Sequence, residues 1–103
     1  MELEKDLIEI ISLSGEVKKE FLEAVKYAKN NEFGKAEEVF NKADDKLIKT
    51  HLKQTKLIKK EANGEDIESS LMLTHAQDHL MTAILLKDMA KEFIDLYARF
   101  EDN

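Results

Sequence analysis

The sequence predicts an all-α protein, and three observations carry that prediction. The 103-residue chain has no Pro and only three Gly, whereas a β-sandwich needs turn residues about every 8–12 positions. Charged residues make up 37% of the chain and hydrophobic residues 43%, a mixture typical of amphipathic helices rather than of disorder. Apolar residues recur at steps of three and four, with no useful length of strand-like alternation. The length allows one domain, residues 1–103.

Two short segments carry turn-forming residues and divide the chain into three helices. The first, residues 30–34, reads Asn-Asn-Glu-Phe-Gly, and Asn tolerates the left-handed conformation that closes a helix. The second, residues 63–66, reads Asn-Gly-Glu-Asp. There Gly64 can take a positive φ, and Asp66 or Ser69 can cap the next helix. We therefore expect helices at about residues 2–30, 33–62 and 67–101. Such short connections make neighbouring helices antiparallel, which predicts an up-down-up bundle.

Each of the first two helices has one apolar face. The apolar positions of the first helix are Leu3, Leu7, Ile10, Val17, Phe21, Ala24 and Ala28. Those of the second are Phe33, Ala36, Phe40, Ala43 and Leu47. The second face then becomes polar at His51, Gln54 and Thr55, which is unusual for a stripe that should pack on a neighbour.

The third helix is apolar on two sides. One broad face holds His75, Asp78, His79, Thr82, Leu86, Met89, Phe93, Tyr97 and Phe100, while Leu73, Leu80 and Ile84 lie nearly opposite, with Met81 and Leu85 between. A surface helix of a monomeric bundle needs only one apolar side. The second side predicts a further partner, most simply other copies of the same chain.

A polar cluster interrupts the apolar stripe of the third helix. His75, Asp78 and His79 lie one turn apart on one face, and a buried carboxylate is costly unless it is paired or bound to a metal. The cluster could be a solvent-exposed polar cap. It could hold a metal through both histidines, with His51 of the second helix as third ligand. One imidazole could instead be a nucleophile, or the face could dock a partner helix.

Composition excludes several classes of function. The 16 Lys and Arg against 22 Asp and Glu give a net charge of −6, which disfavours nucleic acid because phosphates require a basic surface. The absence of Cys excludes disulfides and thiolate metal sites. There is no Gly-rich phosphate-binding loop or dinucleotide fingerprint. No stretch resembles a signal peptide or membrane span, so we expect a cytoplasmic protein without membrane insertion.

The third helix also carries a family resemblance. Residues 75–82 read His-Ala-Gln-Asp-His-Leu-Met-Thr and resemble the HxQDHLMT segment of the IIA components of the lactose/cellobiose (diacetylchitobiose) class of the bacterial phosphoenolpyruvate-dependent sugar phosphotransferase system. Further resemblances to the family occur along nearly the whole chain, at residues 10–12, 14–15, 31–36 and 51–55.

This resemblance implies a fold and an activity. The fold is a homotrimer of three-helix subunits. The activity is that of a phosphoryl carrier, which accepts its group from the phosphohistidine of HPr and passes it to a cysteine of the cognate IIB component during disaccharide uptake. The disaccharide would be cellobiose, chitobiose or lactose, and the sequence does not choose among them.

The resemblance also implies roles for individual residues. His75 would be the phosphoryl acceptor, and Gln77 and His79 would be pocket residues. Asp78 would lie near the threefold axis, where three copies share one divalent cation, expected to be Mg²⁺. The polar residues His51, Gln54 and Thr55 would either line a neighbouring subunit's groove or form hydrogen bonds between helices. The alternative to this whole assignment is a helical metal-binding or scaffolding oligomer without covalent chemistry.

Overall fold

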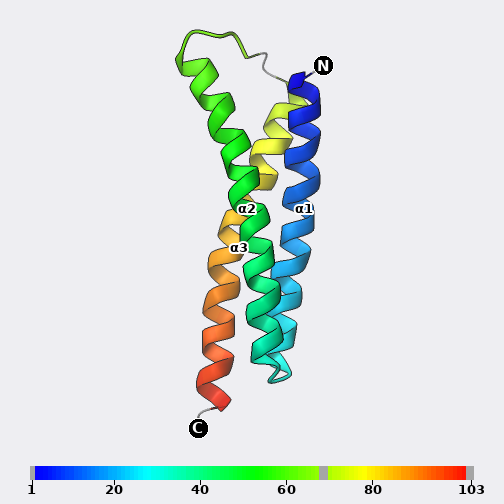
Figure 1. Ribbon diagram of the computed structural model, residues 1–103, viewed down its shortest axis with the longest axis vertical. Helices are drawn as coiled ribbons and strands as arrows, with labels where there is room; N and C mark the ends of the chain where they lie inside the picture. Colours follow the sequence, from blue (N-terminus) through cyan, green and yellow to red (C-terminus); the bar gives the residue numbers. More distant parts are fainter. Residues whose placement is uncertain (1, 68–69, 102–103) are drawn as a thin grey trace.

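The computed structural model describes residues 2–67 and 70–101. These residues form three helices: α1 (Glu2–Lys29), α2 (Phe33–Ala62) and α3 (Leu71–Glu101). The helices alternate in direction within a rod of 56 × 20 × 19 Å. In the view of Figure 1, α1 runs down, α2 runs up and α3 runs down, and the first turns of α3 lie between the upper parts of α1 and α2. The predicted all-α, three-helix fold is confirmed. None of the described helices has the length and apolar character needed to cross a membrane.

Both predicted helix ends have the expected backbone conformation. Asn31 has a φ of 63°, and the N–H of Glu32 donates to the carbonyl of Tyr27, which closes α1. Gly64 has a φ of 90° and follows the end of α2, where left-handed backbone favours glycine. Local turn chemistry therefore determines where α1 and α2 end.

The start of α3 differs from the prediction. The helix begins at Leu71 rather than at residue 67, because Ser70 is its N-cap: the Ser70 hydroxyl accepts a hydrogen bond from the N–H of Leu73 at 3.0 Å. Asp66, one of the two predicted caps, is separated from the helix. The other, Ser69, lies outside the described residues.

The core is built around α1. Both α2 and α3 pack extensively on α1 and much less on each other. The buried core residues are Leu7, Ile10, Val17 and Phe21 of α1, Ala43, Leu47 and Leu57 of α2, and Ala76, Leu80, Ala83 and Ala90 of α3. The ring of Phe21 packs on that of Phe40 with centroids 5.1 Å apart. Alanines at many contact positions let the helix axes approach closely.

The second apolar side of α3 is confirmed as an exposed stripe. It consists of Leu71, Leu85, Met89, Phe93, Leu96 and Phe100, all of them exposed in the single chain. The predicted set of residues on this side of the helix was partly wrong, since Leu86 packs against the core cluster and Tyr97 is half-buried. The outer stripe is interrupted by the exposed Asp78 between Leu71 and Leu85, and it has large apolar residues from Leu85 to Phe100.

Replacing Phe21 tests the core. Phe21→Ala removes a fully buried ring and should lower the free energy of unfolding by about 3–5 kcal/mol, measured by urea unfolding followed by circular dichroism. Glu23→Ala is the matched control, because Glu23 is exposed on the same helix and should change stability by less than about 0.5 kcal/mol. Equal effects of the two substitutions would contradict this core.

Candidate functional site

Two histidines of α3 form the centre of the candidate site. His75 is exposed in the second turn of the helix, and His79 is half-buried one turn later. Their ring centroids are 4.6 Å apart and the rings are nearly perpendicular, at 86°. The predicted pair therefore lies together, as residues four apart on a helix do.

A lysine of α1 contacts this histidine pair. The Nζ of Lys18 lies 3.1 Å from the Nδ1 of His79. An ammonium group can only donate, so Nδ1 accepts and the proton of the neutral ring is assigned to Nε2. This leaves the Nε2–H of His79 as a free hydrogen-bond donor. Lys18 was not among the predicted site residues, because its contact depends on how α1 and α3 are rotated and aligned.

The surroundings of His79 favour its neutral form. Burial lowers the pKa of the His79 imidazole below its ordinary value, and the positive charges of Lys18 and His75 lower the pKa further. Burial also lowers the pKa of the Lys18 ammonium. Both shifts act in the same direction, because positive charge at this half-buried position is unfavourable.

His75 also borders an apolar depression. The side chains around it are Ile11 of α1 and Leu71 and Met72 of α3, and both α3 residues are exposed. An imidazole surrounded by exposed apolar side chains is suited to contact with another protein, because docking removes that surface from water.

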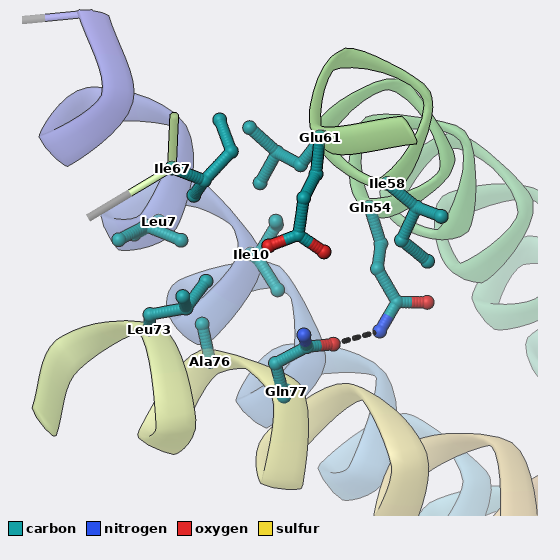
Figure 2. Close-up of a pocket in the computed structure, with 10 residues that line it drawn as sticks. Leu7, Ile10, Gln54, Ile58, Glu61, Ile67, Leu73, Ala76 and Gln77 are labelled. Atoms are coloured by element: carbon teal, nitrogen blue, oxygen red, sulfur yellow. Dashed lines mark hydrogen bonds between the residues drawn. The ribbon is translucent and has the colours of Figure 1, made fainter. Parts of the chain in front are cut away.

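Gln77 is directed away from this pair. Its Oε1 accepts a hydrogen bond from the Nε2 of Gln54 on α2, and Figure 2 shows the two amides facing each other across the helices. They border a cavity of about 40 Å³ whose other walls are mostly apolar. Residues two apart on a helix project about 200° apart, so Gln77 and His75 do not meet within one chain. Gln54 thus forms a hydrogen bond between helices, one of the two predicted roles.

Asp78 is on the outer side of α3. Its side chain is exposed, and the exposed Leu71 and Leu85 lie two turns before and after it on the same face. In residues 2–67 and 70–101, no three His, Asp or Glu side chains gather closely enough to hold a metal ion. The three-ligand metal site of His51, His75 and His79 is therefore wrong for the single chain. His51 lies exposed on α2.

Comparisons with known proteins agree on one family. The family model of the lactose/cellobiose-specific IIA subunits of the phosphotransferase system (PTS) matches residues 5–98. The lactose-specific EIIA component of Streptococcus mutans is 48% identical over 91 residues, which are 88% of each chain.

Solved structures show the same relationship. The crystal structure of the cellobiose-specific PTS enzyme IIA of Bacillus anthracis superposes with a TM-score of 0.93 at 42% identity, covering 97% of this chain and 92% of that one. In the solution structure of the IIA(chitobiose)–HPr complex from the N,N′-diacetylchitobiose branch of the Escherichia coli system, the matching chain has a TM-score of 0.85 at 35% identity, with 98% of each chain covered.

The protonation of His79 can be measured. Long-range ¹H–¹⁵N NMR should show the Nε2–H tautomer and a titration midpoint below the ordinary histidine pKa of about 6.5. At pH values between the lowered pKa of His79 in the folded chain and the ordinary pKa, His79 binds a proton in the unfolded chain but not in the folded chain. The free energy of unfolding should therefore fall as the pH is lowered through this range. An Nδ1–H tautomer, or a midpoint above 6.5, would contradict the contact with Lys18.

Proposed function

The chain belongs to the lactose/cellobiose-specific IIA family of the phosphotransferase system, and from that premise we propose that His75 carries the phosphoryl group. Family membership makes the protein a phosphotransfer component of a sugar PTS. It argues against the alternative of a scaffolding oligomer without covalent chemistry. The observation that supports His75 is its exposed ring, which borders an apolar depression.

The proposed reaction is a transfer between two nucleophiles on partner proteins. The lone pair of an unprotonated ring nitrogen of His75 attacks the phosphorus of the HPr phosphohistidine. A new N–P bond forms while the old one breaks and its electron pair returns to the HPr ring. In the second step, the thiolate of a IIB cysteine attacks the phosphorus. A P–S bond forms, and the electron pair of the N–P bond returns to His75. No nucleotide takes part, and the exchange takes place in the cytoplasm.

HPr as donor is supported by a relative. The IIA(chitobiose) protein of Escherichia coli forms a complex with HPr, and we extend that partnership to this chain. The exposed Leu71 and Met72 beside His75 would be covered by the docked partner. Docking would then exclude water, which competes with the acceptor for the phosphoryl group.

His79 and Gln77 are proposed as pocket residues. His79 has a free Nε2–H donor next to His75, and such a donor can bond to a phosphoryl oxygen. Gln77 keeps its own amide donors while its Oε1 is engaged by Gln54. Because Gln77 faces α2, it would line the phosphoryl pocket of a neighbouring subunit. It could line the pocket around His75 of its own chain only after its hydrogen bond with Gln54 breaks.

A homotrimer is the proposed assembly. The exposed stripe of α3 runs from Leu71 to Phe100, and exposing so long an apolar surface to water is unfavourable. Packing three copies of α3 around one axis would bury it on all three subunits at once. A closed threefold arrangement uses the same stripe from every chain.

Asp78 is proposed to bind one divalent cation per trimer, with Mg²⁺ the expected ion. It is the charged residue of the outer face between Leu71 and Leu85, so three copies would meet on the axis. Three carboxylates brought together in an apolar interface repel one another. A divalent cation offsets that repulsion, and carboxylate oxygens are suitable ligands for it.

The relatives indicate a class of disaccharides. The relatives are named for lactose, cellobiose and chitobiose, and a IIA component contacts HPr and IIB rather than the sugar. The proposed role is therefore phosphoryl supply for uptake of a disaccharide of this class.

Phosphorylation of His75 tests the proposal. Incubation with phosphoenolpyruvate, enzyme I and HPr should add one acid-labile phosphoryl group per chain, measured by intact mass. His75→Gln should remove the label completely. His51→Gln is the matched control, because His51 is exposed on another helix, and it should keep the label. Full labelling of His75→Gln would overturn the assignment.

Asp78 is tested by native mass and metal content together. The native protein should have the mass of three chains and contain one divalent cation per trimer. Asp78→Leu should lose the cation and remain trimeric, since leucine removes the repulsion and extends the apolar stripe. Asp88→Leu, on the exposed surface of the same helix, should keep the cation. A monomeric native protein, or unchanged metal content in Asp78→Leu, would contradict the axial placement.

A further inference from the structure

We propose that Lys18 of α1 is the cation that binds the phosphoryl group carried by His75. In the unphosphorylated protein, its ammonium group is held by the Nδ1 of His79. After phosphorylation it bonds to the phosphoryl oxygens. This inference rests on the proposed function, because it takes His75 as the phosphoryl acceptor.

The first observation is the difference between Lys18 and the other half-buried lysines. Among the residues that the structure describes, four lysines are half-buried: Lys18, Lys46, Lys53 and Lys87. The last three each form an ion pair with a carboxylate of a neighbouring helix, at distances of 2.6–3.0 Å. In the described part of the chain, Lys18 pairs with no carboxylate, and its partner is a neutral ring nitrogen.

The electrostatics agree with this difference. Hydrogen bonds to Glu16 and Glu20 raise the pKa of the Lys46 ammonium, and a hydrogen bond to Glu9 raises that of Lys53. Burial instead lowers the pKa of Lys18. A partly desolvated cation without a counter-charge gains from any anion that arrives beside it.

Phosphorylated His75 would supply that anion. The Lys18 ammonium contacts the ring of His79, and that ring lies 4.6 Å from the His75 ring, centroid to centroid. A phosphoryl group carries about −1.5 to −2 charges near neutral pH and extends beyond the ring nitrogen that bears it. Lysine ends in a compact charge on a flexible four-carbon chain, so Nζ can move from the imidazole nitrogen to a phosphoryl oxygen without movement of α1.

The nearby carboxylates of α1 do not compete for Lys18. Glu16 and Glu20 flank it in the sequence, but both are engaged by Lys46 of α2. Their negative charge is therefore directed away from the histidine pair. The arrangement keeps Lys18 available to the histidine side of the helix.

The equilibrium of phosphoryl exchange tests the proposal. Phospho-HPr and the native protein are mixed, and the distribution of phosphate between HPr and this protein is measured by mass once it is constant. Lys18→Met keeps the apolar stem and removes the charge, and should shift the equilibrium constant about tenfold toward phospho-HPr, a size typical of one hydrogen bond to a charged group. Lys18→Arg should stay within about threefold of the native value, since arginine also binds phosphate. Lys19→Met, an exposed neighbour, should leave the constant unchanged.

The equilibrium constant distinguishes binding of the phosphoryl group from a role in docking HPr. A lysine needed only for docking HPr would slow the exchange without changing its end point. A Lys18→Met constant within twofold of native would therefore overturn the inference and leave His75 as acceptor intact. A shift equal in Lys18→Met and Lys18→Arg would also overturn it. Failure to label the native protein would overturn the proposed function with it.

Thermal unfolding followed by circular dichroism verifies that each variant folds. Lys18→Gln is a second neutral variant with the same expectation as Lys18→Met.

Discussion

The packing of α3 on α1 is the constraint on which the rest of the structure depends. Ala76, Leu80 and Ala83 are fully buried on the inner face of α3, and their burial sets the rotation of that helix. With this rotation, Asp78 and the exposed apolar stripe must face outward. It also places His79 beside Lys18. The site is therefore a product of core packing, since the histidines and Lys18 all lie on helices.

The same rotation leaves one side of α3 for the core and the other side for the proposed trimer. A rod of 56 × 20 × 19 Å has little interior, so a single chain can bury only the inner side of α3. The outer side has large apolar residues as far as Phe100, and its polar interruption at Asp78 lies within two turns of the start. An assembly that covers the stripe would enclose this carboxylate among apolar side chains. In the proposed trimer, the burial of the apolar stripe and the cation proposed at Asp78 would therefore be linked.

The sequence separation of each interaction explains which features could be predicted from the sequence and which could not. The turns at Asn31 and Gly64 depend on local backbone conformation, and the pairing of His75 with His79 depends only on helical spacing, so these were predictable. The start of α3 was placed four residues early, because several neighbouring residues could act as its cap. Lys18 was missed because its contact joins residues 61 positions apart, and periodicity within a helix does not determine the rotation and register between two helices.

The weak attachment of Lys18 is suited to a carrier that must both accept and release its group. If Lys18 were paired with a carboxylate, as Lys46 is with Glu16 and Glu20, an incoming phosphoryl group would have to displace an anion. A neutral imidazole nitrogen is a weaker partner for an ammonium than a carboxylate is, so it can be exchanged for phosphoryl oxygens at little cost. The reverse exchange, when the group leaves, returns Lys18 to His79 rather than to water. A half-buried cation held by a neutral partner can thus stabilise the phosphorylated state without making it permanent.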